Sequence, residues 1–189
     1  MAGFTLAELL IALAVLGVIA TFTIPKVLNA QQNSHDNAIA KEVAGMASGA
    51  YTAFKQTSQP DQNTAMDSLL PYFNHIKIDT ASVVDGIPGG GAFDCSVVGN
   101  RCLVMHSGAV IGYSQGLKFG GTTSLHAIAV AVDPDGKLTG AGGDTGKSVQ
   151  FVLYFDGRLT TRANALTGTQ TSAGGIGPSP GSDPTWFSW

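Results

Sequence analysis

Charged side chains are scarce in this sequence. Asp, Glu, Lys and Arg make up 12% of the 189 residues, and the formal net charge is −3 at pH 7. Proteins that bind nucleic acid neutralise its phosphates with clustered lysine and arginine, and no such cluster is present. We therefore expect no nucleic-acid partner.

The sequence also lacks the local motifs of common enzymes. It contains no phosphate loop, no dinucleotide fingerprint and no Gly-x-Ser-x-Gly elbow. The four histidines are scattered and never fall at a metal-binding spacing such as His-Glu-x-x-His, so we interpret them as solvated or packed: His35, His75, His106 and His126. We predict no catalytic residues and no enzymatic activity.

Cysteine is limited to Cys95 and Cys102. The intervening Ser-Val-Val-Gly-Asn-Arg has a Gly-Asn centre that can turn the chain back, so the two thiols can reach each other. In an oxidising compartment they would form a disulfide across a loop of about 8 residues, and in a reducing cytosol they would remain thiols.

Charge is almost absent from Phe4 to Ile24, where Glu8 is the single charged side chain. As a helix this run is roughly 30 Å long, which matches the hydrocarbon core of a bilayer. Apolar residues surround the whole helix, so a helix lying on the membrane surface is disfavoured. A basic start and a small-residue exit are missing, which favours a retained anchor over a cleaved secretory signal.

Glu8 is the informative residue of this run. A carboxylate near the bilayer centre costs about 2.5 kcal/mol or more. In one interpretation Glu8 lies about one turn from the helix start, where headgroups and the positive end of the helix dipole tolerate it. In the other, a cationic partner offsets the cost.

The octapeptide Gly3-Phe4-Thr5-Leu6-Ala7-Glu8-Leu9-Leu10 resembles the prepilin peptidase site of type IV pilins and type II secretion pseudopilins. The resemblance implies that the peptidase removes residues 1–3 by cutting after Gly3, and that Phe4 becomes N-methylated. It also implies that Glu8 meets the amine of Phe4 on a neighbouring subunit during assembly. The implied location is the inner membrane, with the head in the periplasm or outside.

Gly17 and Pro25 also agree with the family pattern. Pro25 has no N–H to donate to the Thr21 carbonyl, and glycine is a weak helix residue, so the intervening stretch is predisposed to kink or unwind. We predict that residues 17–25 lose helical hydrogen bonds on assembly. A bent membrane helix is the simpler alternative.

A second, amphipathic helix segment follows a polar stretch. Apolar residues recur at steps of three and four along one side and predict a face that packs on a sheet, with the helix ending near Gln59 before Pro60: Ile39, Val43, Met46, Ala47, Ala50, Tyr51 and Phe54. We assign residues 4–25 to the transmembrane and assembly helix and residues 26–59 to its extension.

Residues 60–171 have the turns and apolar runs of a globular α+β head. Strands are predicted at 102–106, 109–113, 125–132 and 148–155, which gives a long helix on an antiparallel sheet of about four strands. The segment Ala131–Leu159 also resembles the carboxy-terminal half of many prepilins. Residues 172–189 are rich in Gly, Ser and Pro and predict a flexible tail, whose aromatic residues have the potential to dock.

Asp133, Asp135 and Asp144 form a candidate calcium site, because carboxylates and loop carbonyls are the ligands that calcium prefers. Some pseudopilins bind calcium in a loop near the end of the head. The alternative is a metal-free turn, since Asp-Pro-Asp-Gly is a good turn sequence and the spacing is not that of an EF-hand.

These patterns predict a structural subunit of a filament, either a type IV pilus or a type II secretion pseudopilus. Its partners would be further copies or related pilin subunits, prepilin peptidase and the inner membrane. The alternative is a single-pass membrane protein whose head binds a ligand or acts as an enzyme and never polymerises. Glu8 discriminates between them, because a solitary anchor has no use for an intramembrane carboxylate.

Overall fold

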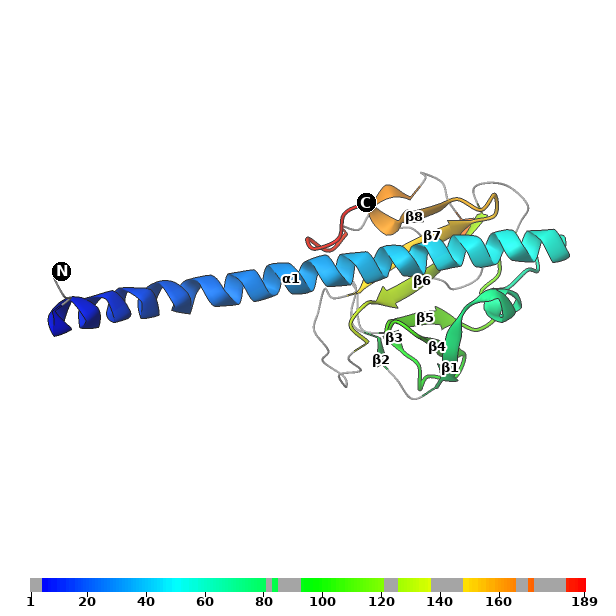
Figure 1. Ribbon diagram of the computed structural model, residues 1–189. Helices are drawn as coiled ribbons and strands as arrows, with labels where there is room; N and C mark the ends of the chain where they lie inside the picture. Colours follow the sequence, from blue (N-terminus) through cyan, green and yellow to red (C-terminus); the bar gives the residue numbers. More distant parts are fainter. Residues whose placement is uncertain are drawn as a thin grey trace. The chain divides into compact units, whose positions relative to one another are not determined.

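The computed structural model describes residues 5–80, 83–84, 93–120, 126–136, 148–165, 170–171 and 183–189. The chain divides into two compact units, Met1–His35 and Asp36–Trp189. One helix, α1 (Leu6–Thr57), contributes residues to both units (Figure 1).

The first unit contains α1 from its start to His35, which includes the apolar run of the helix. Pro25 lies inside the helix, so the Thr21 carbonyl has no N–H donor at its usual position. The Thr21 hydroxyl donates to the carbonyl of Gly17 at 2.8 Å, one turn earlier. The stretch between Gly17 and Pro25 is helical here, and its unwinding on assembly remains a prediction.

In the second unit α1 buries the apolar face that the sequence predicts. All but Met46 of the predicted positions are buried, and Met46 packs at the margin. The helix ends at Thr57, where the Thr57 hydroxyl donates to the Phe54 carbonyl at 3.1 Å. The 3-10 helix η1 (Met66–Tyr72) follows and contributes Met66 and Leu69 to the core.

The main sheet has six antiparallel strands in the order β1-β4-β5-β6-β7-β8, and a short parallel strand pairs with β6. The strands are β1 (His75–Asp79), β4 (Asn100–Met105), β5 (Val110–Ser114), β6 (His126–Asp133), β7 (Val149–Tyr154), β8 (Leu159–Thr161) and β9 (Gln170–Thr171). A second 3-10 helix, η2 (Arg162–Asn164), follows β8. The α+β class is confirmed.

The expectation of about four strands is too low. The four predicted runs correspond to β4 to β7, whereas β1 and β8 are the two edges of the sheet. Strand β1 is mostly exposed and β8 has only 3 residues, so neither produces a strong apolar pattern. An edge strand has a partner on one side only and is often short or exposed, which limits aggregation with other chains. A search for buried apolar runs therefore misses such strands.

Helix α1 covers one face of the sheet, and a small two-stranded sheet covers part of the other. The first face forms the main core with α1, through residues such as Leu103, Ile111, Phe151 and Leu153. On the other face, β2 (Val83–Val84) pairs with β3 (Phe93–Asp94). Gly112 permits this second layer, because a Cβ there would lie 2.6 Å from a ring carbon of Phe93.

Residues 183–189 are docked on the second unit. Phe187 is 7% exposed and meets the ring of Phe151 edge-on at 5.6 Å. The Thr161 hydroxyl donates to the Asp183 carboxylate at 2.6 Å. The end of the predicted flexible tail is therefore ordered, because its aromatic side chains complete the core, while residues 172–182 lie outside the described residues.

Candidate functional site

Glu8 lies in the first turn of α1 and interacts with Thr5 (first unit). The backbone N–H and the hydroxyl of Thr5 each donate to Glu8 Oε2 at 2.8 Å, and the Glu8 N–H lies 3.3 Å from the Thr5 hydroxyl oxygen. This reciprocal arrangement is a capping box, produced by the spacing Thr-x-x-Glu. It turns the carboxylate toward the start of the helix. Gly3 and Phe4 lie outside the described residues.

The described part of the helix around this carboxylate has an apolar, exposed surface. Helix α1 is long and apolar enough to cross a membrane, and none of its most apolar window is buried. Leu9, Leu13 and Leu16 are each more than half exposed. An apolar surface on all sides of a helix requires lipid or other apolar segments around it.

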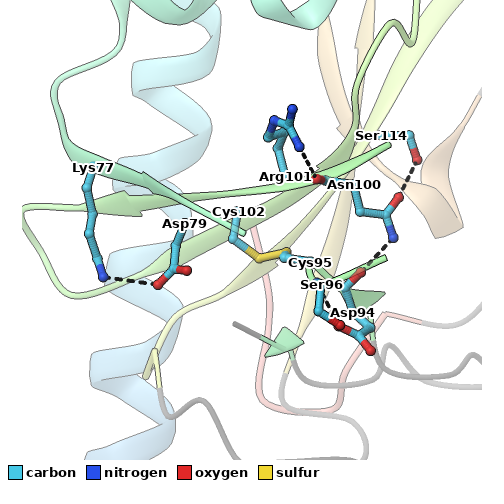
Figure 2. Close-up of a disulfide and its surroundings, with 9 residues drawn as sticks. All are labelled: Lys77, Asp79, Asp94, Cys95, Ser96, Asn100, Arg101, Cys102 and Ser114. Atoms are coloured by element: carbon cyan, nitrogen blue, oxygen red, sulfur yellow. Dashed lines mark hydrogen bonds and ion pairs between the residues drawn. A yellow bond between two sulfur atoms is a disulfide. The ribbon is translucent and has the colours of Figure 1, made fainter. Parts of the chain in front are cut away.

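The structure joins Cys95 and Cys102 in a disulfide with a Cα–Cα distance of 5.7 Å (Figure 2). Cys102 lies in β4 and Cys95 directly follows β3, so the bond links the small sheet to the main one. Both half-cystines are buried with Val84 and Val110. The disulfide therefore stabilises the second layer as well as its own loop.

Asp133 ends β6 and caps the turn that follows. Its Oδ1 accepts the backbone N–H groups of Asp135 at 3.2 Å and Gly136 at 3.3 Å, and Gly136 has a positive φ of 59°. These bonds are those of a turn that needs no metal. Asp144 lies outside the described residues, so the calcium trio as a set remains a prediction.

Two of the histidines bond to backbone carbonyls. His75 Nδ1 lies 3.0 Å from the Phe73 carbonyl, and His126 Nδ1 lies 3.0 Å from the Phe119 carbonyl. Within the described ranges, no three His, Cys, Asp or Glu side chains come together as a metal site. The geometry of these residues selects no catalytic group.

An open groove of about 350 Å³ in the second unit was not anticipated from the sequence. One wall is a stripe of α1 formed by Lys41, Ala44, Gly45 and Ser48, and the other is the turn Gly157–Leu159 between β7 and β8, with Trp189 at one end. The sequence feature that corresponds to this groove is a set of small residues at helical spacing on α1, namely Ala44, Gly45 and Ser48. Sequence alone did not indicate which turn would face it.

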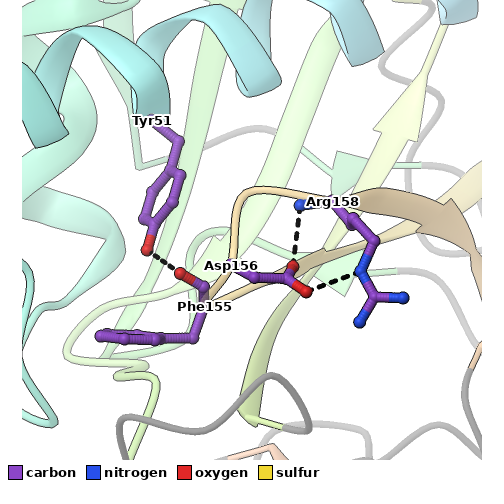
Figure 3. Close-up of polar contacts among 4 residues, drawn as sticks. All are labelled: Tyr51, Phe155, Asp156 and Arg158. Carbon is purple, nitrogen blue, oxygen red and sulfur yellow. Dashed lines mark hydrogen bonds and ion pairs between the residues drawn. The ribbon is translucent and has the colours of Figure 1, made fainter.

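The turn beside the groove is held by polar contacts (Figure 3). The Tyr51 hydroxyl donates to the Phe155 carbonyl, and Arg158 Nε donates to Asp156 Oδ2 at 2.6 Å. Burial, and secondarily the Asp156 carboxylate, raises the pKa of Tyr51 to about 12. The buried phenol therefore stays protonated and anchors the turn to α1.

Comparisons with protein-family models, with curated proteins and with solved structures find no match to this chain.

Proposed function

We propose that this chain is a structural subunit of a filament of the type IV pilus or type II secretion pseudopilus class. In this proposal α1 anchors the chain in the inner membrane, prepilin peptidase cuts after Gly3, and the subunits then assemble through their apolar helices. The products are a homo-oligomer or a filament with related subunits.

The observation that carries the proposal is the environment of Glu8. This residue is the only charged side chain between Phe4 and Ile24, and the apolar surface around it is exposed. An unpaired carboxylate in hydrocarbon is costly, and Thr5 supplies only neutral donors. A cation from another chain, at a newly formed N-terminus, would neutralise it.

The reciprocal bonds with Thr5 support the same role. They hold the carboxylate at the amino-terminal end of the helix, which is where the resemblance places the processed amine of a neighbour. A positioned carboxylate loses less side-chain entropy when its partner arrives. Thr5 is thus a positioning residue for Glu8 in this proposal.

The alternative function is a membrane-anchored binding protein that stays solitary. The groove beside Lys41, Arg158 and Trp189 is the observation that favours it, since it has both an aromatic wall and cations. This alternative assigns no use to Glu8 within the membrane.

The decisive experiment measures processing and assembly in the same membranes. Intact-mass analysis should show loss of residues 1–3 and addition of one methyl group. Glu8→Lys should abolish filament incorporation and leave the melting of the head unchanged. Glu42→Lys is the matched control, because it makes the same charge change at an exposed position of the same helix. A chain that keeps residues 1–3 and stays monomeric in lipid would refute the proposal.

A further inference from the structure

The second unit carries an exposed apolar knob formed by Val97 and Val98, and Asp94 precedes Val97 by three residues in the sequence. Val98 is 100% exposed and Val97 is 53% exposed. Apolar side chains at the tip of a loop contribute nothing to their own fold when they are this exposed. Their apolar surface is available to a partner.

A disulfide and several hydrogen bonds hold the loop that carries the knob (Figure 2). The disulfide between Cys95 and Cys102 closes the loop, and the Asn100 amide donates to the Asp94 carbonyl at 2.7 Å. Asp94 Oδ1 also accepts the N–H of Ser96 at 2.8 Å and its hydroxyl at 2.7 Å. A loop fixed in this way loses little conformational entropy when it docks.

The knob is also acidic at neutral pH. The bonds from Ser96 lower the pKa of Asp94, so a negative charge lies three residues before Val97 along the chain. A matching surface therefore needs an apolar depression bordered by a cation.

The groove between α1 and the β7–β8 turn has these properties. Its lining includes the small residues Ala44 and Gly45 and the cationic side chains Lys41 and Arg158. Arg158 bonds to Asp156 through Nε, and its two terminal nitrogens point away from that carboxylate (Figure 3). Among the described residues that line the groove, none has a carboxylate side chain.

We propose that the knob of one copy docks in the groove of a second copy of this chain. The knob adjoins β4, next to the β1 edge of the sheet, whereas the groove lies at the β8 edge. A chain therefore cannot fill its own groove. The assigned contact is heterologous and leaves one knob and one groove free in each pair, so it continues from copy to copy, whereas a reciprocal contact would close as a dimer.

This contact deepens the proposed function and rests on it. A loop tip in one groove buries less than the roughly 1,200 Å² at the low end of stable interfaces. The contact should therefore form where assembly through α1 already brings copies together. It would fix the rotation of neighbouring heads.

Cysteine cross-linking of assembled full-length chains tests the proposal. The variant carries Val98→Cys and Gly45→Cys, since Val98 is fully exposed and a Cβ at Gly45 meets nothing within 4 Å. Oxidation should give a ladder of covalent multimers on a non-reducing gel. The control pairs Gly45→Cys with Ile76→Cys, which is 58% exposed on β1, and should give no ladder.

Each outcome has one meaning. Filaments with a ladder support the contact, and filaments without a ladder overturn it while leaving the proposed function intact. Dimers from Val98→Cys alone would show that two knobs meet, which also overturns it. A chain that forms neither filaments nor ladder refutes both proposals. Binding of a uronic acid oligosaccharide that is lost in Trp189→Ala would assign the groove to a soluble anion and overturn the contact.

A double-mutant cycle gives a second readout that needs no new thiol. Asp94→Asn removes the charge and keeps the side-chain oxygen that accepts from Ser96, and Lys41→Met removes the cation. Each variant should lower the assembled fraction by about tenfold, the effect of one close charge pair. The double variant should lose little more than either single variant, because both changes remove the same interaction, and fully additive losses in variants with native melting would count against a direct contact.

Discussion

The hydroxyl of Thr5 lies 2.8 Å from the carboxylate Oε2 of Glu8, one helical turn away. The single charged group of the apolar segment is therefore held by its own chain in a defined direction. A polar group inside a membrane is costly unless it is satisfied, and neutral donors satisfy a carboxylate only in part. In the proposed filament, this bond would orient Glu8 toward a cation from another copy without replacing that cation.

Thr5→Val should weaken assembly, because it removes the hydroxyl and keeps the size and shape of the side chain. Helix caps of this kind contribute about 1 kcal/mol, so we expect a loss of roughly fivefold in assembled fraction. Thr5→Ser keeps the hydroxyl and should assemble normally. Quantifying filaments from equal amounts of membrane checks the prediction, and equal yields from Thr5→Val and Thr5→Ser would contradict it.

Removing the disulfide should destabilise the second unit by about 2 to 3 kcal/mol, the entropy expected for a loop of this length. The double variant Cys95→Ser and Cys102→Ser tests this. Its unfolding in urea can be monitored by the fluorescence of Trp186 and Trp189. Reduction of the disulfide in the native chain should likewise lower the urea concentration at the midpoint of unfolding. An unchanged midpoint in both measurements would contradict a stabilising role.

Alkaline pH should destabilise the second unit through Tyr51. Folding favours the neutral phenol, so the folded pKa of about 12 exceeds the ordinary value of 10.0. The stabilisation is complete below pH 10 and is lost as the pH rises toward 12. Tyr51→Phe leaves the Phe155 carbonyl without its donor and should cost about 1 to 3 kcal/mol at neutral pH.

The same variant should lose less stability than the native chain between neutral pH and pH 11, because it lacks one titrating group. Burial also raises the pKa of Tyr113, so some loss should remain in the variant. Urea unfolding at several pH values provides the comparison. A parallel decline in both proteins would show that Tyr51 does not titrate in this way.

Gly157→Ala should destabilise the second unit by more than Gly116→Ala. Both glycines have positive φ, 95° and 76°, so each substitution carries a backbone cost of about 1 to 2 kcal/mol. A Cβ at Gly157 would also approach the Tyr51 ring at 3.3 Å, whereas one at Gly116 meets nothing within 4 Å. The difference between the two melting temperatures isolates the contact between the turn and α1, and equal shifts would contradict it.

Some features of this protein follow from local chemistry and were predictable. The apolar run from Phe4 to Ile24, the amphipathic face from Ile39 to Phe54 and the four central strands each have a period or composition typical of the element expected there. The Thr-x-x-Glu capping box is likewise a local pattern, since its donors and acceptor lie within one turn. The disulfide between Cys95 and Cys102 is also local, because the two residues have a sequence separation of only 7.

The sequence by itself determined the membrane-competent helix, the α+β class and the position of Glu8, because these depend on residues that are neighbours along the chain. Tertiary structure alone decided the edge strands, the docking of Phe187 and the groove between α1 and the β7–β8 turn. These features join residues far apart in sequence, such as Gly45 and Gly157, whose proximity is fixed by packing of the whole core. No local pattern carries that information.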